Sequence, residues 1–388
     1  MNITGIVAEY NPFHNGHKYM IEQARIKGAT HIIAVMSGAA VQRGDIAVFD
    51  KHFRAKKAVE NGADLVIELP FPYSCSNGET FADSAIYLLS ALGKGVVNSL
   101  AFGCENDNAE LLIRASEASE KLKDNELVKE FIANGKSYPL AICTAAEKIY
   151  GEKIGNILKS PNNILAVEYI KACKKYCDSI NFMPVKRKNA SHDGSEVVDN
   201  FASASEIRKR INSNSDLCNL CPYEIDTPIY FLENMEREIL FRIHTMSKEN
   251  LLQLSDCNEE IADKILTAIS MCPKNLNEFM NSIKSKNITM ARLRRIIMYA
   301  ILGEKKTDMF LPPYIRILAF NQKGAEILSL SKNSLLPSDT SLKKLESSSE
   351  NAKRIVKLEN NAVNFQYACI KGKYNPQNEF RRSIKILK

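Results

Sequence analysis

The architecture of this chain follows from residues 3–17, which read ITGIVAEYNPFHNGH. The first part, Ile3 to Glu9, is a short apolar run of the kind that forms a buried strand. A loop follows, and the pattern predicts a helix from about His17 to Lys27. In an open parallel sheet, ligands bind outside the carboxyl ends of the strands. We therefore expect the loop between Glu9 and His17 to lie at a ligand-binding edge.

Similar apolar runs recur in the first half of the chain and alternate with stretches of helical pattern. The further predicted strands are 31–36, 63–69, 97–102 and 180–185, and the predicted helices are 51–61, 78–92 and most of 108–175. Strands that alternate with helices of this length indicate an α/β fold with a mostly parallel sheet.

The pattern changes at about residue 216, where helical periodicity replaces strand-like runs. One helical face carries Met235, Ile239, Ile243 and Met246, and further helices are predicted at 258–271, 275–283 and 290–302. Residues 329–350 are rich in Ser and Lys, which indicates an exposed linker. We therefore expect an α/β domain over 1–215, a mostly α-helical domain over 216–328, and a linker with a basic C-terminal segment over 329–388.

The composition excludes several classes of protein. Of the 388 residues, 45% are apolar and 25% are charged, and the net charge is +7. This is ordinary globular composition, unlike that of a disordered, collagen-like or coiled-coil chain. No apolar run approaches the roughly 18 residues of a membrane-spanning helix, so no membrane partner is expected. The ten Cys are scattered and no basic leader precedes the first strand, which favours a reduced, cytoplasmic protein.

Two histidines stand at the predicted start of the first helix. His14 and His17 are three residues apart, with Gly16 between them. A helix start offers unpaired N–H groups and a positive dipole end, both of which suit phosphate. Two imidazoles there can donate to phosphate oxygens as negative charge moves onto a leaving pyrophosphate. The alternative is a turn with incidental histidines, but the position directly after the first strand favours the phosphate site.

A second candidate segment is Ser203-Ala204-Ser205-Glu206-Ile207-Arg208, which follows the last predicted strand. By itself it could be an ordinary capped helix start. Together with His14-Asn15-Gly16-His17 it resembles the paired motifs of the HIGH superfamily of nucleotidyltransferases. The resemblance implies a Rossmann-like parallel sheet that binds ATP and activates its α-phosphate. Ser203, Ser205 and Arg208 would then hold the outer phosphates, since hydroxyl and guanidinium groups suit that task.

A narrower resemblance covers roughly residues 1–210 and continues more loosely beyond. The segments that carry it are VAEYNPFHNGHKYM at 7–20, VQRG at 41–44, NGADLVIELP at 61–70, FG at 102–103 and PNNIL at 161–165. They are similar to the bacterial tRNA(Met) cytidine acetate ligase family. The resemblance implies that ATP and acetate form acetyl-adenylate. The acetyl group then passes to N4 of the wobble cytidine of elongator tRNA(Met), and AMP and pyrophosphate are released.

The same resemblance places the ATP site on particular residues of this chain. His14, His17 and Arg208 take the catalytic role at the phosphates. The other implied ATP contacts are Val7, Ala8, Glu9, Tyr10, Asn11, Pro12, Phe13, Asn15, Gly16, Lys18, Tyr19, Met20, Gly103, Arg187, Ser203, Ser205 and either Asn162 or Asn163. The sequence departs from the family at Ala39 and Ala40, where bulkier residues are expected.

The remaining chemistry follows from what the residues offer. No protein carboxylate identifies itself as a metal ligand, so no metal site is predicted and Mg²⁺ would be carried by ATP. The thiols of Cys173, Cys177, Cys218 and Cys221 lack the spacing of a zinc site. No Ser-His-Asp or Cys-His pair indicates an acyl-enzyme, and the reaction needs no acetyl-CoA. Gln42 and Arg43 belong either to a loop over acetate or RNA, or to an ordinary surface loop.

The helical domain is expected to bind the tRNA. A basic cluster there consists of Lys284, Lys286, Arg292, Arg294 and Arg295. Its arginines are expected to flank an apolar helix face and project toward solvent, which would form a ridge along RNA phosphates. The alternative is a solvated helix face without a partner.

Two other functions remain possible from the residues alone. One is a small-molecule nucleotidyltransferase, against which the long segment after residue 215 argues. The other is an RNA-binding protein with a degenerate nucleotide pocket, against which the complete His14-Asn15-Gly16-His17 motif argues.

Overall fold

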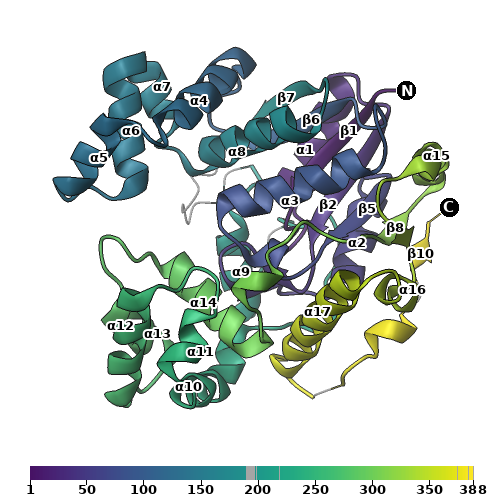
Figure 1. The fold of residues 1–388 in the computed structure, drawn as a ribbon. Coiled ribbons are helices and arrows are strands. Elements are labelled where there is room, and N and C mark those ends of the chain that lie inside the picture. The colour runs from purple at the N-terminus through teal and green to yellow at the C-terminus, as the bar shows by residue number, and fades with distance from the viewer. Residues whose placement is uncertain (189–196, 198, 218, 374, 383, 388) are drawn as a thin grey trace.

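A computed structural model describes all residues of the chain except 189–196, 198, 218, 374, 383 and 388 (Figure 1). Its centre is an eight-stranded sheet in the order β10-β8-β5-β2-β1-β6-β7, with β9 paired to β8. The strands are β1 (Ile3–Ala8), β2 (His31–Ser37), β5 (Leu65–Leu69), β6 (Ser99–Cys104), β7 (Asn181–Lys186), β8 (Ile315–Phe320), β9 (Ser338–Asp339) and β10 (Lys385–Ile386). A separate hairpin pairs β3 (Ala40–Val41) with β4 (Asp45–Ile46).

The five strands of the first half run parallel, as the sequence predicts. In β1, Ala8 pairs with Met36 of β2, and in β6, Gly103 pairs with Val185 of β7. Every residue of β2 and of β5 is buried, because helices cover both faces of a parallel sheet. The carboxyl ends of β1, β2, β6 and β7 therefore meet at one edge.

Helices divide between the two faces of the sheet. Successive residues of β2 alternate, so that Ile32 and Ala34 belong to the core under α1 (Asn15–Ile26) and α2 (Lys51–Glu60), while Ile33 and Val35 face the other core. On that other face, α3 (Gly78–Ala91) and α8 (Pro161–Tyr176) lie side by side (Figure 1). Between them in sequence come α4 (Ala109–Leu122), α5 (Glu126–Ala133), α6 (Tyr138–Tyr150) and α7 (Glu152–Ile157).

The helices predicted in the second half are present as α10 (Glu236–His244), α12 (Glu259–Ser270), α13 (Leu276–Ile283) and α14 (Met290–Leu302). α9 (Ala204–Asn212) begins at the predicted helix start at Ser203, and α11 (Lys248–Leu252) is a short helix that the sequence pattern did not predict. Ile239, Ile243 and Met246 are buried together, and Met235 is half-buried against the same core, which confirms the predicted apolar face. None of the helices in the described part of the chain has the length and apolar content needed to cross a membrane.

Residues 329–388, expected to hold an exposed linker and a basic C-terminal segment, contain regular helices and strands. After β8 the chain forms α15 (Gln322–Leu330), α16 (Leu342–Glu346) and α17 (Glu350–Ala368), and β10 then joins the sheet edge. The 19-residue α17 buries Ile355, Val356 and Val363 at helical spacing, directly after the Ser- and Lys-rich stretch at 329–350. β8 also returns to the sheet from within the region predicted to be mostly helical, and it runs antiparallel to β5.

A cluster of buried charges attaches this C-terminal part to the parallel sheet. The ammonium of Lys51 lies 2.6 Å from Glu68, 2.9 Å from Glu359 and 3.0 Å from Glu379. Arg316 of β8 lies 2.6 Å from Glu379 and 3.3 Å from Glu68. Charges in a core are tolerated only when partners compensate for lost hydration. The cluster therefore joins α2, β5, β8 and α17 into one unit.

Replacement of Arg316 by Ala should destabilise the protein strongly. The change leaves Glu68, Glu359 and Glu379 with Lys51 as the remaining buried cation of this cluster, and uncompensated buried charge typically costs about 3–5 kcal/mol. Urea unfolding measures the free energy directly. Lys344→Ala, which breaks an exposed pair with Asp339, is the control and should have little effect. A loss for Arg316→Ala no larger than for the control would contradict this account.

Candidate active site

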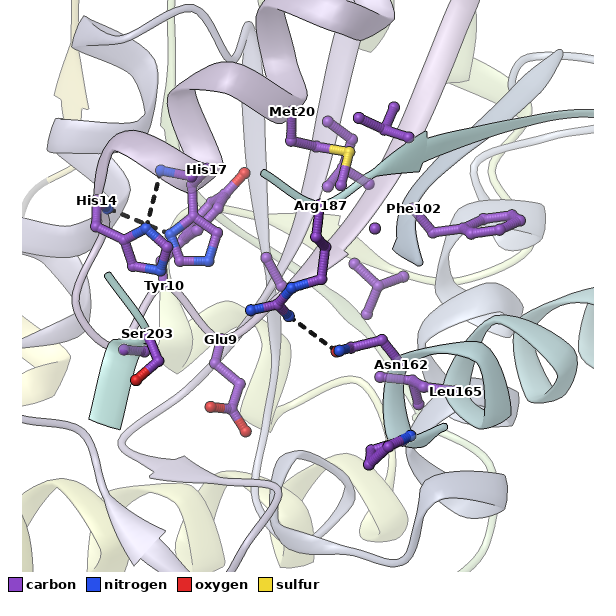
Figure 2. Close-up of a pocket in the computed structure, with 18 of the residues that line it drawn as sticks. Glu9, Tyr10, His14, His17, Met20, Phe102, Asn162, Leu165, Arg187 and Ser203 are labelled. Atoms are coloured by element: carbon purple, nitrogen blue, oxygen red, sulfur yellow. Dashed lines mark hydrogen bonds between the residues drawn. The ribbon is translucent and has the colours of Figure 1, made fainter. Parts of the chain in front are cut away.

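A cavity of about 530 Å³ opens at the carboxyl ends of β1, β6 and β7 (Figure 2). Its size is typical of a site for a small ligand. The predicted site residues that line it are Val7, Ala8, Glu9, Tyr10, His14, Gly16, His17, Tyr19, Met20, Gly103, Asn162, Arg187, Ser203, Ser205 and Arg208. The structure thus brings the two motifs, about 190 residues apart in sequence, to one cavity.

The first turn of α1 fixes both imidazoles. His14 is the N-cap residue, and its Nδ1 accepts from the Gly16 N–H at 3.0 Å. The His14 N–H in turn donates to Nδ1 of His17 at 3.2 Å, and the two ring centres are 3.9 Å apart. These hydrogen bonds are dashed in Figure 2. Because each Nδ1 is an acceptor, a neutral ring carries its proton on Nε2, where it is a donor.

Both imidazoles are held in the neutral form. Burial, followed by the charges of Arg187 and Arg208, lowers the pKa of His14 to about 3. Burial, then His14 and Arg187, lowers the pKa of His17 well below its usual value. The cavity is therefore rich in cationic and N–H groups, and an anionic ligand would relieve their mutual repulsion.

An aromatic floor supports the pair. The ring of Tyr10 meets His17 edge-on at 4.8 Å and Phe13 at 4.9 Å. The backbone of Tyr10 has a left-handed φ of 47°, uncommon for a residue with a Cβ, and Tyr10 is almost fully buried. This packing restricts the rotation of His17, so the helix start and the floor together determine its orientation.

The second motif begins α9 beside the first. Ser203 caps the helix and accepts from the Glu206 N–H at 3.2 Å. Arg208 donates to the carbonyl oxygen of Asn11 at 2.8 Å and lies 3.5 Å from the Ser205 hydroxyl. The guanidinium thus ties α9 to the loop after β1, and the start of α9 faces the cavity through Ser203, Ala204 and Ser205.

The opposite side of the cavity comes from the ends of β6 and β7. Arg187 donates to the Asn162 side chain at 2.9 Å (Figure 2). Asn162 in turn donates to Glu105 at 2.6 Å. A Cβ at Gly103 would lie 3.1 Å from Cε of Met20, so glycine keeps this wall open. Asn162 is therefore the asparagine that lines the cavity. Asn163 is buried and accepts from the N–H groups of Glu105 at 2.9 Å and Asn106 at 3.1 Å, so it holds the loop after β6.

Six predicted contacts do not line the cavity: Asn11, Pro12, Phe13, Asn15, Lys18 and Asn163. The side chain of Asn11 accepts from the Val48 N–H at 2.8 Å. That of Asn15 donates to the carbonyl oxygens of Asn200 and Asn219. Phe13 is buried in the core and Lys18 is exposed on α1. Strand and helix geometry therefore divides this continuous segment into residues that face the cavity and residues that support the loop.

Sequence reasoning missed the apolar wall and one buried arginine. The wall consists of Phe81, Phe102, Ile164, Leu165 and Tyr169. Arg54 is fully buried and donates to the carbonyl oxygens of Glu9, Ser37, Gly38 and Phe49. It thereby holds the ends of β1 and β2 together. Arg54 stands in an ordinary helical pattern, so the sequence alone does not indicate this role.

The basic cluster of the helical domain differs from its prediction. Arg295 is buried, with Nε 2.6 Å from the Asp256 carboxylate, so the expectation that it projects toward solvent is wrong. Arg292 donates to the Asp256 carbonyl at 2.8 Å, and Arg292 and Arg294 are half-buried. Lys284 and Lys286 are exposed, and Lys286 donates to the Gly135 carbonyl. The apolar face of α14 is wider than predicted and includes the position of Arg295.

Among the residues that the structure describes, no three His, Cys, Asp or Glu side chains gather so as to hold a metal ion. Cys218 lies outside the described residues.

The first strand of the parallel sheet leads into a helix start that carries two neutral imidazoles, and a second capped helix start lies opposite. This arrangement defines a nucleotidyltransferase-type protein of the HIGH class. The HIGH Nucleotidyl Transferase family model matches residues 1–381. The tRNA(Met) cytidine acetate ligase of Clostridium tetani is 36% identical over 98% of each chain, and that of Staphylococcus aureus is 34% identical over 84% of this chain and 86% of its own. The chain belongs to the tRNA(Met) cytidine acetate ligase family and is an enzyme, as the resemblance predicts.

Solved structures agree with this membership. Thermotoga maritima TmcAL bound with alpha-thio ATP has a TM-score of 0.85 and 29% sequence identity, over 99% of this chain and 97% of that chain. The apo form of the same protein gives a TM-score of 0.88. The predicted Rossmann-like parallel sheet of the HIGH type is thereby confirmed.

The buried imidazoles should make the empty enzyme sensitive to acid. An unfolded His has a pKa near 6.5, whereas native His14 stays neutral until the pH approaches about 3. Below pH 6.5 the unfolded chain therefore binds more protons than the native protein, and stability falls as the pH falls. Between pH 7 and pH 5 the loss from one such group is about 2 kcal/mol.

Urea unfolding at both pH values checks this expectation. His14→Gln should reduce the acid-induced loss, whereas His244→Gln, on the exposed end of α10, should leave it unchanged. An acid-induced loss in His14→Gln equal to that of the wild type would contradict the neutral state.

Proposed function

We propose that this enzyme activates acetate with ATP and transfers the acetyl group to N4 of the wobble cytidine of elongator tRNA(Met). The observation that carries the proposal is the start of α1, where two neutral imidazoles present Nε2 donors to a cavity that α9 also faces. The names of the curated relatives and the ATP analogue bound to the Thermotoga protein support it.

In the first step, an acetate oxygen attacks the α-phosphorus of ATP. An O–P bond forms, the bond to the β-phosphate oxygen breaks, and pyrophosphate leaves with the electron pair. His14 and His17 donate to the oxygens on which charge develops, which is the largest contribution that such a site makes. Ser203, Ser205 and Arg208 hold the outer phosphates, and ATP enters with Mg²⁺ bound to those phosphates.

In the second step, N4 of the cytidine attacks the acetyl carbonyl of the mixed anhydride. A C–N bond forms, the C–O bond to AMP breaks, and N4 releases a proton to solvent. The anhydride is already activated, so neither an acyl-enzyme nor acetyl-CoA is required. We place the reaction in the cytoplasm, where tRNA is available.

The tRNA approaches along the helical domain. Lys284, Lys286, Arg292 and Arg294 provide positive charge for its phosphates, while Arg295 acts through its pair with Asp256. Phosphate contacts position the RNA, and the single base must be turned out of its stack to reach the cavity.

Replacement of either active-site histidine by Ala should slow the first step. We expect acetate-dependent exchange of pyrophosphate into ATP to fall by about 10²–10³-fold, the usual effect of removing one such donor. Binding of tRNA, measured by filter retention, should change less than about twofold because the helical domain is untouched. The matched control is His244→Ala. Parallel losses of exchange and of tRNA binding would count against the assigned role.

An assay with ATP, labelled acetate and bulk tRNA tests the whole reaction. Label should appear in one tRNA species, in acid-stable form on cytidine. Label that enters tRNA only from acetyl-CoA would refute the proposal. Pyrophosphate release that needs a metabolite but neither acetate nor RNA would instead identify a small-molecule nucleotidyltransferase.

A further inference from the structure

The cavity has a side that the nucleotide contacts leave unassigned. The implied ATP contacts come from the ends of β1, β6 and β7 and from α9. On the β2 side, the cavity is lined by Gln42, Arg43, Gly78 and Phe81. We propose that Arg43 binds the carboxylate of acetate and that this corner is the acetate subsite, an inference that rests on the proposed function.

The turn that carries Arg43 is held firmly in place. The hairpin of β3 and β4 closes through the Gly44 N–H, which donates to the Val41 carbonyl at 3.0 Å. Gly44 has φ +77°, and a Cβ there would lie 2.3 Å from the backbone nitrogen of Arg295, so glycine lets the turn pack directly on α14. Arg43 is thus exposed at the tip of an anchored three-residue turn.

Contacts of Gln42 orient this turn toward the end of β1. Its N–H donates to the Glu9 carboxylate at 3.0 Å, and its side-chain amide donates to the Ser76 carbonyl at 3.0 Å. Glu9 follows β1 directly, beside the loop that leads to the two histidines. The hairpin tip therefore faces the reaction centre, and the start of α3 borders it on the other side.

The charges indicate what Arg43 can bind. Acetate and the α-phosphate are both anions, and they must come within bonding distance. A cation on the acetate side reduces this repulsion, and the planar guanidinium matches a carboxylate with two parallel hydrogen bonds. Arg43 and Arg187 line the same cavity. Burial lowers the pKa of Arg187, the charge of Glu105 opposes this shift, and the charge of Arg43 adds to it, so an anion bound in the cavity would be favoured by both guanidinium groups.

The same corner offers a surface for the methyl group. Phe81 lies on the first turns of α3, is almost fully buried, and presents part of its surface to the cavity. A corner that holds a carboxylate on Arg43 and a carbon chain against this ring fits a small monocarboxylic acid. Larger acids would meet the ring.

Kinetics of acetate-dependent pyrophosphate exchange, measured without tRNA, tests the subsite. Arg43→Gln should raise the KM for acetate by about tenfold or more and leave the KM for ATP within about twofold. Arg43→Lys keeps the positive charge but loses the two parallel N–H donors of the guanidinium, so its KM for acetate should lie between those of the wild type and Arg43→Gln. The matched control is Arg237→Gln, an exposed arginine of α10 outside the cavity lining, which should retain both KM values.

The outcomes separate the subsite from the proposed function. An unchanged KM for acetate in Arg43→Gln, together with weaker tRNA acetylation, would assign Arg43 to the RNA and overturn the inference. Raised KM values for ATP and acetate alike would also overturn it, since they would assign Arg43 to the nucleotide. Absence of acetate-dependent exchange in the wild-type enzyme would instead refute the proposed function itself.

Discussion

The two hydrogen bonds from backbone N–H groups to the Nδ1 atoms of His14 and His17 are the constraint on which the site depends. They cap α1, and because both Nδ1 atoms accept, they also fix each neutral ring in the tautomer that has its proton on Nε2. A helix start without these caps would still attract phosphate, but its imidazoles could rotate or exchange donor for acceptor. Tyr10 below and Arg208 beside the loop restrict the same segment from two further directions.

The strand order then distributes the substrates around this point. β1 is central, with β6 and β7 on one side and β2 on the other. Residues at the ends of β6 and β7 form the nucleotide side, and the hairpin after β2 forms the other side. Arg54 donates to the carbonyl oxygens of Glu9, Ser37 and Gly38, so one buried guanidinium fixes the end of β1 relative to the end of β2 and the hairpin that follows it. Its burial is acceptable because these carbonyl oxygens replace water as acceptors.

The first half of the fold could be predicted because its information is local. Each parallel strand lies within two residues of its predicted bounds, since each is a short, mostly apolar run between turns. The motifs at His14 and Ser203 likewise act through adjacent residues. The C-terminal part could not be predicted for the opposite reason. Arg316 and Glu359 interrupt apolar patterns, and their partners Glu68 and Lys51 lie about 250 to 310 residues away in the sequence. Asn162 and Asn163 differ only in helical register, which the sequence could not assign without the loop after β6.

The departure at Ala39 and Ala40 bears on whether the pocket is degenerate. Both alanines are fully buried, and neither lines the cavity. The Ala39 N–H donates to Glu359 at 3.0 Å, and a Cβ at the neighbouring Gly38 would lie 2.5 Å from that carboxylate. The small residues therefore lie where the loop after β2 packs closely on α17. The departure changes the support behind the hairpin, while the imidazoles, Arg187, Arg208 and Arg43 still line one cavity. Cations alone would serve a protein that only binds a nucleotide, but the two imidazoles are also fixed with their Nε2 donors available for a developing charge, which favours the enzyme over the degenerate pocket.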